Sequence, residues 1–203
     1  MASTSGRARP RSIEPVFDVV LGIDPGVSRC GYGAVSRDGS RFTATLCGVI
    51  RTSPAEPLPN RLALLAAELD ALIAETRPVA IAVERVLFQV NARTAMSVGQ
   101  ASGLALAIAG REHIPVVQYS PNEVKLAVAG DGGADKREVG EMVARLLGLR
   151  EVPGPADVAD ALALAVCHWW RVPLQAAVAA DTRGGSRLEA AIAAAVQRER
   201  SDR

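Results

Sequence analysis

The order of the apolar segments is the feature that most limits how this 203-residue chain can fold. Three strand-like segments come first, at Val16–Ile23, Gly31–Ser36 and Phe42–Ile50. Strand-like and helix-like segments then alternate, and the last segments are all helical: Arg61–Ala74, Val79–Val83, Ala92–Gly110, Pro115–Tyr119, Ser120–Ala129, Ala134–Gly148 and Ala156–Trp170. This order predicts an α/β fold in which helices flank a mixed sheet.

The composition is that of an ordinary folded protein, with 49% hydrophobic and 22% charged residues. It excludes an intrinsically disordered chain. No apolar run approaches the roughly 20 residues that span a bilayer, so we expect no membrane partner. Cys30, Cys47 and Cys167 are odd in number and form no C-x-x-C pair. They indicate reduced thiols in a cytoplasmic protein, with neither a zinc site nor a disulfide framework.

The chain divides into three parts. Residues 1–15 are polar and contain three arginines, which predicts a flexible basic lead-in. Residues 16–172 contain all the strong apolar segments and form the expected domain. Residues 173–203 are Ala-rich and polar, and we expect them to be mobile or to form a loosely docked helix. The formal net charge is only +1, so any site for a polyanion depends on local placement of charge.

Four acidic residues interrupt apolar sequence. Asp24 and Glu84 each follow a strand-like segment, whereas Asp157 and Asp160 lie three residues apart in an apolar helix and therefore share one face. Clustered carboxylates repel one another, and a divalent cation relieves that repulsion. Oxygen ligands without Cys or His favour Mg²⁺ or Mn²⁺ over zinc. Two such ions about 3.5–4 Å apart are a known arrangement for cleaving phosphodiester bonds by in-line attack of water.

Two of these acids have simpler interpretations. Asp24 belongs to Asp-Pro-Gly, which is typical of a turn, and Asp157 could cap the helix that follows Pro155. Glu84 and Asp160 occupy neither kind of position. The spacing alone therefore favours the metal site only slightly over a structural role for the acids.

Short motifs follow one another along most of the chain: Gly22-Ile23-Asp24-Pro25-Gly26, Gly31-Tyr32-Gly33, Val83-Glu84-Arg85-Val86 with Asn91, Gly99-Gln100-Ala101, Pro121 to Lys125, Gly130, Ala134-Asp135-Lys136 and Ala156 to Ala163. In their order and spacing they resemble the RuvC family of Holliday-junction resolvases, from about Val19 to Trp169. Each motif is short, but the ordered set is highly specific.

The resemblance implies a ribonuclease-H-like fold with a five-stranded mixed sheet flanked by helices. It implies that Asp24, Glu84, Asp157 and Asp160 are the catalytic, metal-binding acids, with two Mg²⁺ ions per site or Mn²⁺ as a substitute. It further implies a homodimer that nicks four-way junction DNA symmetrically, in recombination and repair. A branch-migration motor complex of the RuvA and RuvB type is the implied partner.

The resemblance also implies three DNA-binding residues. Lys125 and Lys136 match positions that the family uses near the DNA backbone, and they are the only two lysines among 23 basic residues. Phe88 follows Glu84 in an expected loop, where an aromatic ring could stack on bases. The family pattern has its aromatic residue one position earlier, where this chain has Leu87, so the choice between Leu87 and Phe88 stays open.

Three other functions fit parts of the pattern. Actin-like ATPases and sugar kinases place an Asp-Gly hairpin against phosphate, but those chains carry two such domains and this one has no second phosphate hairpin. A non-catalytic junction-binding module would be expected to lack one or more of the four acids. A nuclease of the same fold acting on RNA–DNA hybrids is the nearest alternative, and the motif at Ala156–Ala163 disfavours it.

Overall fold

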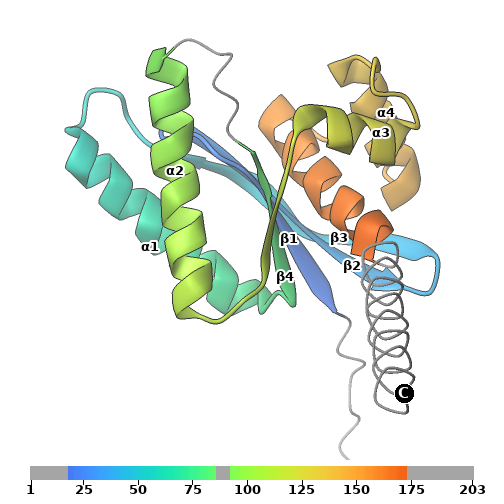
Figure 1. Cartoon of the computed structure of the whole chain (residues 1–203), viewed down its shortest axis with the longest axis horizontal. Helices are drawn as coiled ribbons and strands as arrows, with labels where there is room; N and C mark the ends of the chain where they lie inside the picture. The colour runs from blue at the N-terminus through green and yellow to red at the C-terminus, as the bar shows by residue number, and fades with distance from the viewer. Residues whose placement is uncertain (1–17, 86–91, 173–203) are drawn as a thin grey trace, which may run out of the picture.

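The computed structural model describes residues 18–85 and 92–172. Five strands form one sheet in the order β3-β2-β1-β4-β5 (Figure 1). Their bounds are β1 Val19–Asp24, β2 Arg29–Asp38, β3 Arg41–Arg51, β4 Ala80–Glu84 and β5 Val116–Tyr119. The first three strands pair antiparallel, whereas β4 and β5 continue the sheet in parallel. The five-stranded mixed sheet expected from the sequence is confirmed.

Helices cover both faces of this sheet. They are α1 Leu58–Thr76, α2 Ala92–Arg111, α3 Pro121–Ala129, α4 Lys136–Leu147 and a final helix over residues 156–172. In Figure 1, α1 and α2 lie on one side of the sheet, and α3, α4 and the final helix lie on the other. None of the described helices is long and apolar enough to cross a membrane. The expected lead-in and tail, residues 1–15 and 173–203, lie outside the described residues.

Local sequence explains where α3 and α4 begin. Ser120 caps α3 by accepting a hydrogen bond from the Glu123 amide, and the Glu123 side chain accepts one in return from the Ser120 amide. Asp135 and Glu138 form the same reciprocal pair at α4. The structure therefore confirms the predicted start of α3. It moves the start of α4 from Ala134 to Lys136, because Asp135 caps the helix from outside it.

The sheet separates two hydrophobic cores because successive residues of a strand point to opposite faces. Leu21 and Ile23 of β1 pack with Leu65 and Leu69 of α1, on the α1–α2 side. Val20, two of the neighbouring β4 alanines and the inner faces of α3, α4 and the final helix form the other core. Asp24 lies four residues after Val20 in β1 and therefore points to the same face of the sheet, toward the final helix.

Three glycines bring the final helix unusually close to the sheet. A Cβ atom at Gly22 would overlap the carbonyl oxygen of Ala161, and one at Gly33 would lie 2.7 Å from the Leu162 side chain. Gly31 is similarly close to the backbone of Asp157. Gly22 pairs with Gly33, so these residues form a smooth patch on which the helix backbone rests. The contact sets the position of every side chain in the first turns of that helix.

His168 gives this core a defined pH response. It is 5% exposed, its Nδ1 lies 2.9 Å from the hydroxyl of Tyr119, and burial lowers its pKa from the ordinary 6.5. A lowered histidine pKa means that the unfolded chain binds the proton more tightly, so stability is lost as the pH falls below 6.5. Between pH 7 and pH 5, the melting temperature of the wild type should fall by a few degrees more than that of His168→Asn. A stability change of about 1 kcal/mol shifts the melting temperature by roughly 2–4 °C.

The exposed His113, which adopts a positive φ that asparagine tolerates, supplies the matched control. The variant His113→Asn is expected to melt like the wild type at both pH values. If His168→Asn and the wild type lost the same number of degrees between pH 7 and pH 5, His168 would not be the source of the pH response.

Candidate active site

Two carboxylates meet where parallel strands end. Asp24 is the last residue of β1 and Glu84 is the last residue of β4. The two strands are adjacent and parallel, with Ile23 opposite Val83, so the next residues come side by side at the same edge of the sheet. The Asp24 and Glu84 side chains share a hydrogen bond.

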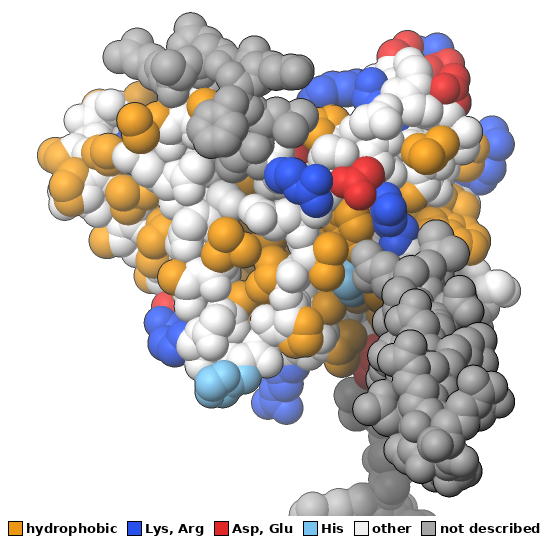
Figure 2. All heavy atoms as spheres, viewed as in Figure 1, with side chains coloured by type: hydrophobic (Ala, Val, Ile, Leu, Met, Phe, Trp, Pro, Cys, Tyr) orange, Lys and Arg blue, Asp and Glu red, His pale blue; other side chains and the backbone are white. Residues whose placement is uncertain are grey.

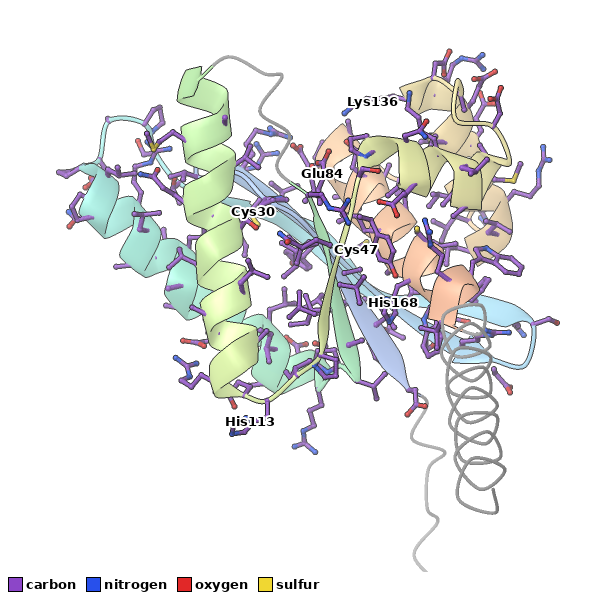
Figure 3. The ribbon with its side chains drawn as sticks, in the orientation of Figure 1. Cys30, Cys47, Glu84, His113, Lys136 and His168 are labelled. Carbon is purple, nitrogen blue, oxygen red and sulfur yellow. The ribbon has the colours of Figure 1, made fainter. Side chains whose placement is uncertain are left out.

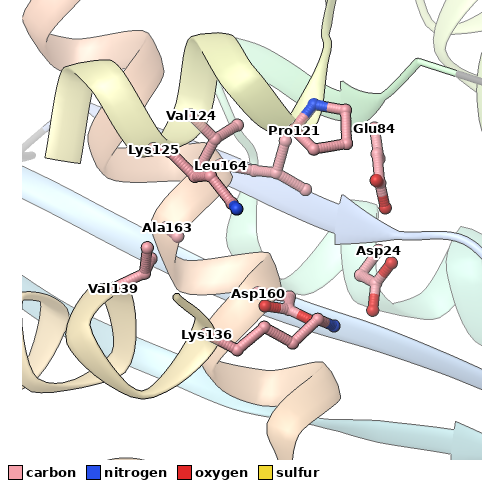
Figure 4. A pocket seen from close by; sticks show the side chains of 10 residues that line it. All are labelled: Asp24, Glu84, Pro121, Val124, Lys125, Lys136, Val139, Asp160, Ala163 and Leu164. Carbon is pink, nitrogen blue, oxygen red and sulfur yellow. The ribbon is translucent and has the colours of Figure 1, made fainter. Parts of the chain in front are cut away.

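A third carboxylate reaches this edge from the final helix. Asp160 directly precedes Ala161, whose carbonyl oxygen lies against Gly22. The glycine patch therefore holds Asp160 opposite the end of β1. Asp24, Glu84 and Asp160 line one cavity of about 140 Å³, together with Lys125 of α3 and Lys136 of α4 (Figure 4). Three of the four sequence-predicted acids and both lysines thus line one cavity, and they come from β1, β4, α3, α4 and the first turns of the final helix.

The cavity holds its acids in an electrostatically costly arrangement. Burial raises the pKa of Asp24 to about 8, and the charge of Glu84 and the hydrogen bond to Glu84 add to the effect, followed by the charges of Asp160 and Asp157. Burial also raises the pKa of Glu84 from its ordinary 4.5. Burial and mutual repulsion thus both oppose ionisation of these two half-buried carboxyl groups, and a bound cation would relieve that cost.

Lys136 offsets part of this negative charge. Its ammonium lies 2.8 Å from Oδ2 of Asp160, and this hydrogen bond raises the pKa of the lysine. Lys125 extends its ammonium into the same cavity (Figure 4). Glu84 and Lys136 lie at the same end of the molecule, while His168 lies well along the final helix (Figure 3). His168, eight residues after Asp160, lies too far along the final helix to join this site.

Asp157 stands apart from the other three acids. It lies in the first turn of the final helix, and its Oδ2 accepts hydrogen bonds from Nε of Arg29 at 3.0 Å and from Nη2 of the same guanidinium. These bonds lower the pKa of Asp157. Because the helix begins at residue 156, Asp157 is inside it and does not cap it. Arg29 was not anticipated from the sequence.

The donor set suits a hard divalent cation. Within residues 18–85 and 92–172, no three His, Cys, Asp or Glu side chains stand close enough to form a ready-made ligand group. Two of the four acids are ion-paired instead, Asp157 with Arg29 and Asp160 with Lys136. The available donors are carboxylate oxygens beside a cavity, without thiol or imidazole, which fits Mg²⁺ or Mn²⁺.

Comparison with known proteins identifies the family. The model of the family described as crossover junction endodeoxyribonuclease RuvC matches residues 20–168, which include all four acids and both lysines. The chain belongs to the RuvC family. RuvC of Frankia alni is 53% identical over 155 residues, covering 76% of this chain and 79% of its relative. RuvC of Salinispora arenicola is 53% identical over 173 residues, covering 83% and 99%.

A solved RuvC structure shares the fold. Thermus thermophilus RuvC in complex with its Holliday junction substrate is 38% identical, covers 78% of this chain and 96% of that one, and superposes with a TM-score of 0.74. The RuvC resemblance and the ribonuclease-H-like fold predicted from the sequence are therefore confirmed. Phe88 and Leu87, the two candidate base-contacting residues, lie outside the described residues.

Proposed function

We propose that this RuvC-family chain resolves Holliday junctions, making paired symmetric nicks in four-way DNA during recombination and repair. The observation that carries the proposal is the family match over the whole domain that bears the carboxylate cavity. The enzyme is a structure-specific endodeoxyribonuclease, and the nuclease domain is assigned to residues 16–172. The Thermus relative, described with a Holliday junction substrate, supports the same class of DNA.

Asp24, Glu84, Asp157 and Asp160 are assigned as the catalytic acids and as the ligands of two Mg²⁺ ions. When bound, such ions lower the pKa of a water and stabilise the leaving oxygen. Asp24 and Glu84 contribute buried carboxylates from rigid strand ends, and Asp160 closes the site from the final helix. Asp157, whose Oδ2 now accepts hydrogen bonds from Arg29, would complete the donor set once that guanidinium moved away.

Three further residues are assigned to the DNA. Lys125 and Lys136 project into the cavity, where an ammonium group would contact the phosphate backbone. Phe88 is retained as the base-contacting aromatic beside Glu84, with Leu87 as the alternative. Figure 2 shows Lys and Arg side chains interspersed with Asp and Glu side chains at the upper right of the viewed face, and a smaller charged group at the lower left.

The decisive experiment compares cleavage of a synthetic four-way junction, a linear duplex and an RNA–DNA hybrid in Mg²⁺, with Glu84→Gln as the non-cleaving control. Paired nicks at symmetric positions in the junction alone support the proposal. Cleavage of the hybrid would reassign the substrate within the same fold. Binding of the junction without cleavage in Mg²⁺ or Mn²⁺ would leave only a binding module.

A homodimer fits both the two-fold symmetry of a junction and the exposed face of α2. Met96 is 65% exposed, Gly99 and Gly103 have open space around them, and Leu106 is 37% exposed. These positions recur at helical spacing, so an apolar strip with small residues faces away from the chain's own sheet. This orientation supports a contact with another subunit over a contact with the chain's own sheet.

Gly103→Leu should weaken the dimer, because the added side chain would keep the facing helices apart. We expect at least about a tenfold rise in the dimer dissociation constant, measured by analytical ultracentrifugation, with the melting temperature of dilute protein nearly unchanged. Leu64→Ala on exposed α1 is the control. Unaltered association in Gly103→Leu would place the dimer contact elsewhere.

The remaining partners and the location follow from the DNA substrate. A branch-migration motor of the RuvA and RuvB type is proposed as the complex that brings junctions to the enzyme. The substrate also supports a cytoplasmic location, where a bacterial chromosome lies.

A further inference from the structure

Two arginines stand next to each other beside the carboxylate site. Arg29 begins β2 and Arg51 ends β3, and the antiparallel register places them directly opposite one another. Directly opposed residues on neighbouring strands project from the same face, and like charges in such a pair are destabilising. A nearby anion, from the protein or from a ligand, would therefore stabilise this pair.

Asp157 supplies that anion in the structure described here. Arg29 donates two hydrogen bonds to Oδ2 of Asp157, and these bonds are the largest cause of the lowered pKa of this carboxyl group. The charges of Arg29 and Arg51 lower the pKa further, whereas partial burial raises it. Within the described residues, the side chain of Arg51 makes no hydrogen bond and no ion pair. Asp157 is thus ion-paired with Arg29 and interacts with Arg51 only through its charge.

The surroundings leave room for a second anion. A hollow of about 500 Å³ opens beside the end of β3, lined by Arg51, by Arg150 and Glu151, and by Pro155 and Val158 of the segment that leads into the final helix. Arg29 is 41% exposed and can reorient without disturbing the core. The hollow therefore adjoins the first turn of the helix that carries Asp157.

Asp157 accepts both hydrogen bonds from Arg29 on a single oxygen, Oδ2. A divalent ion on Oδ2 competes with Arg29 for the same oxygen, which leaves two neighbouring guanidiniums without an adequate counter-ion. Guanidinium groups bind phosphate oxygens in a planar, two-pronged geometry. A DNA strand that crosses the carboxylate cavity carries further phosphates on either side of the cleaved one.

We propose that Arg29 and Arg51 form a binding site for a backbone phosphate of the DNA substrate, which Arg29 reaches when Asp157 exchanges its guanidinium for a divalent cation. The inference rests on the proposed junction-cleaving function and extends it to a strand contact beside the cavity. It makes Arg29 a positioning residue for Asp157 in the metal-free protein and a DNA ligand in the metal-loaded one. Metal and DNA then favour each other's binding, as linkage requires.

The test measures junction affinity by fluorescence anisotropy at several salt concentrations, in EDTA and in Ca²⁺. In Ca²⁺, Arg29→Gln and Arg51→Gln are each expected to weaken binding about threefold to tenfold and to reduce the slope of log K against log salt by about 1. In EDTA, where Asp157 holds Arg29, Arg29→Gln is expected to change the slope little. Arg41→Gln, at the opposite end of β3, is the control and should match the wild type in both buffers.

A second measurement isolates the exchange from DNA binding. Calorimetric titration of Ca²⁺ into the metal-free protein should show several-fold tighter binding in Arg29→Gln, because the competitor for Asp157 is gone. Arg29→Lys preserves the charge and should retain the wild-type salt slope, which separates charge loss from misfolding. Wild-type slopes in both Gln variants in Ca²⁺ would overturn the phosphate site, and unchanged Ca²⁺ affinity in Arg29→Gln would overturn the exchange. Neither result would touch the wild-type cleavage that tests the junction-resolving function.

Discussion

Asp24→Asn is expected to reduce junction cleavage at least about 1,000-fold, because it removes a carboxylate ligand from the end of β1. Asparagine keeps the size of the side chain, so the cavity lined by Glu84 and Asp160 should persist. Binding of the junction is expected to stay within a few-fold of the wild type, since the phosphate contacts come from basic groups. Single-turnover cleavage and anisotropy, measured on the same protein, separate the two effects.

The same substitution should make the metal-free protein more stable at pH 8. The folded-state pKa of Asp24 is raised to about 8 from the ordinary 3.8, so the folded chain holds this proton more tightly than the unfolded chain does. Stability linked to Asp24 is therefore lost as the pH rises from about 4 to 8. Asparagine carries no such penalty, and we expect a gain of about 1–2 kcal/mol at pH 8 that disappears near pH 4.

Chemical denaturation in EDTA at pH 4, 6 and 8 measures this trend. The exposed Asp131→Asn, outside the cavity, controls for the general loss of a negative charge. A stability difference between Asp24→Asn and the wild type that does not vary with pH would contradict the raised pKa. Loss of junction binding together with cleavage would contradict the metal-ligand role.

Gly22→Ala is expected to damage both stability and cleavage, although it adds a single methyl group. Its Cβ would overlap the carbonyl oxygen of Ala161 and lie 3.0 Å from the amide nitrogen of Ala165. Both are backbone atoms of the final helix, which packs against the central strand β1, so neither atom can move without the rest of the helix. We expect a loss of about 3 kcal/mol in the free energy of unfolding.

Cleavage should fall further than stability explains. The final helix must move away from β1, and Asp160 moves with it, whereas Asp24 and Glu84 stay on their strands. A displacement of about 1 Å in a catalytic group can reduce the rate about 100-fold. Cleavage measured at a temperature where the variant is fully folded, as shown by circular dichroism, isolates this geometric effect.

Gly110→Ala is the matched control for the added methyl group. Gly110 lies in α2 with no atom within 4 Å of the position that a Cβ would take. Alanine there should leave cleavage unchanged and stabilise the protein by up to about 1 kcal/mol, since alanine favours helix. If Gly22→Ala behaved like Gly110→Ala, close helix packing would not be what positions Asp160.

Local patterns were sufficient to predict the elements and several of their ends. The strand-like runs before Asp24 and Glu84, and the capping residues Ser120 and Glu123, are properties of short segments and could be interpreted without the fold. The four acids were also identifiable, because a charge at the end of an apolar strand is conspicuous. Their grouping around one cavity depended on the resemblance as well as on the pattern.

Interactions between distant segments could not be predicted in this way. Arg29 and Asp157 are 128 residues apart, and only the packing of the final helix against Gly31 brings them together. The pairing of Arg29 with Arg51 depends on a strand register that includes an irregularity between Ala34 and Val35. For the same reason, the sequence indicated four equivalent acids, whereas the structure separates Asp157 from the three that line the cavity.

The division of the interior by the sheet has a consequence for how the protein can diverge among species. Among the described residues, the buried side chains beneath α1 and α2 form a separate cluster from those beneath the final helix, so substitutions in the two sets should add nearly independently in the free energy of unfolding. The face proposed for subunit contact can therefore accumulate changes while the carboxylates keep their positions. Selection can act on assembly and on chemistry as nearly separate traits within one small domain.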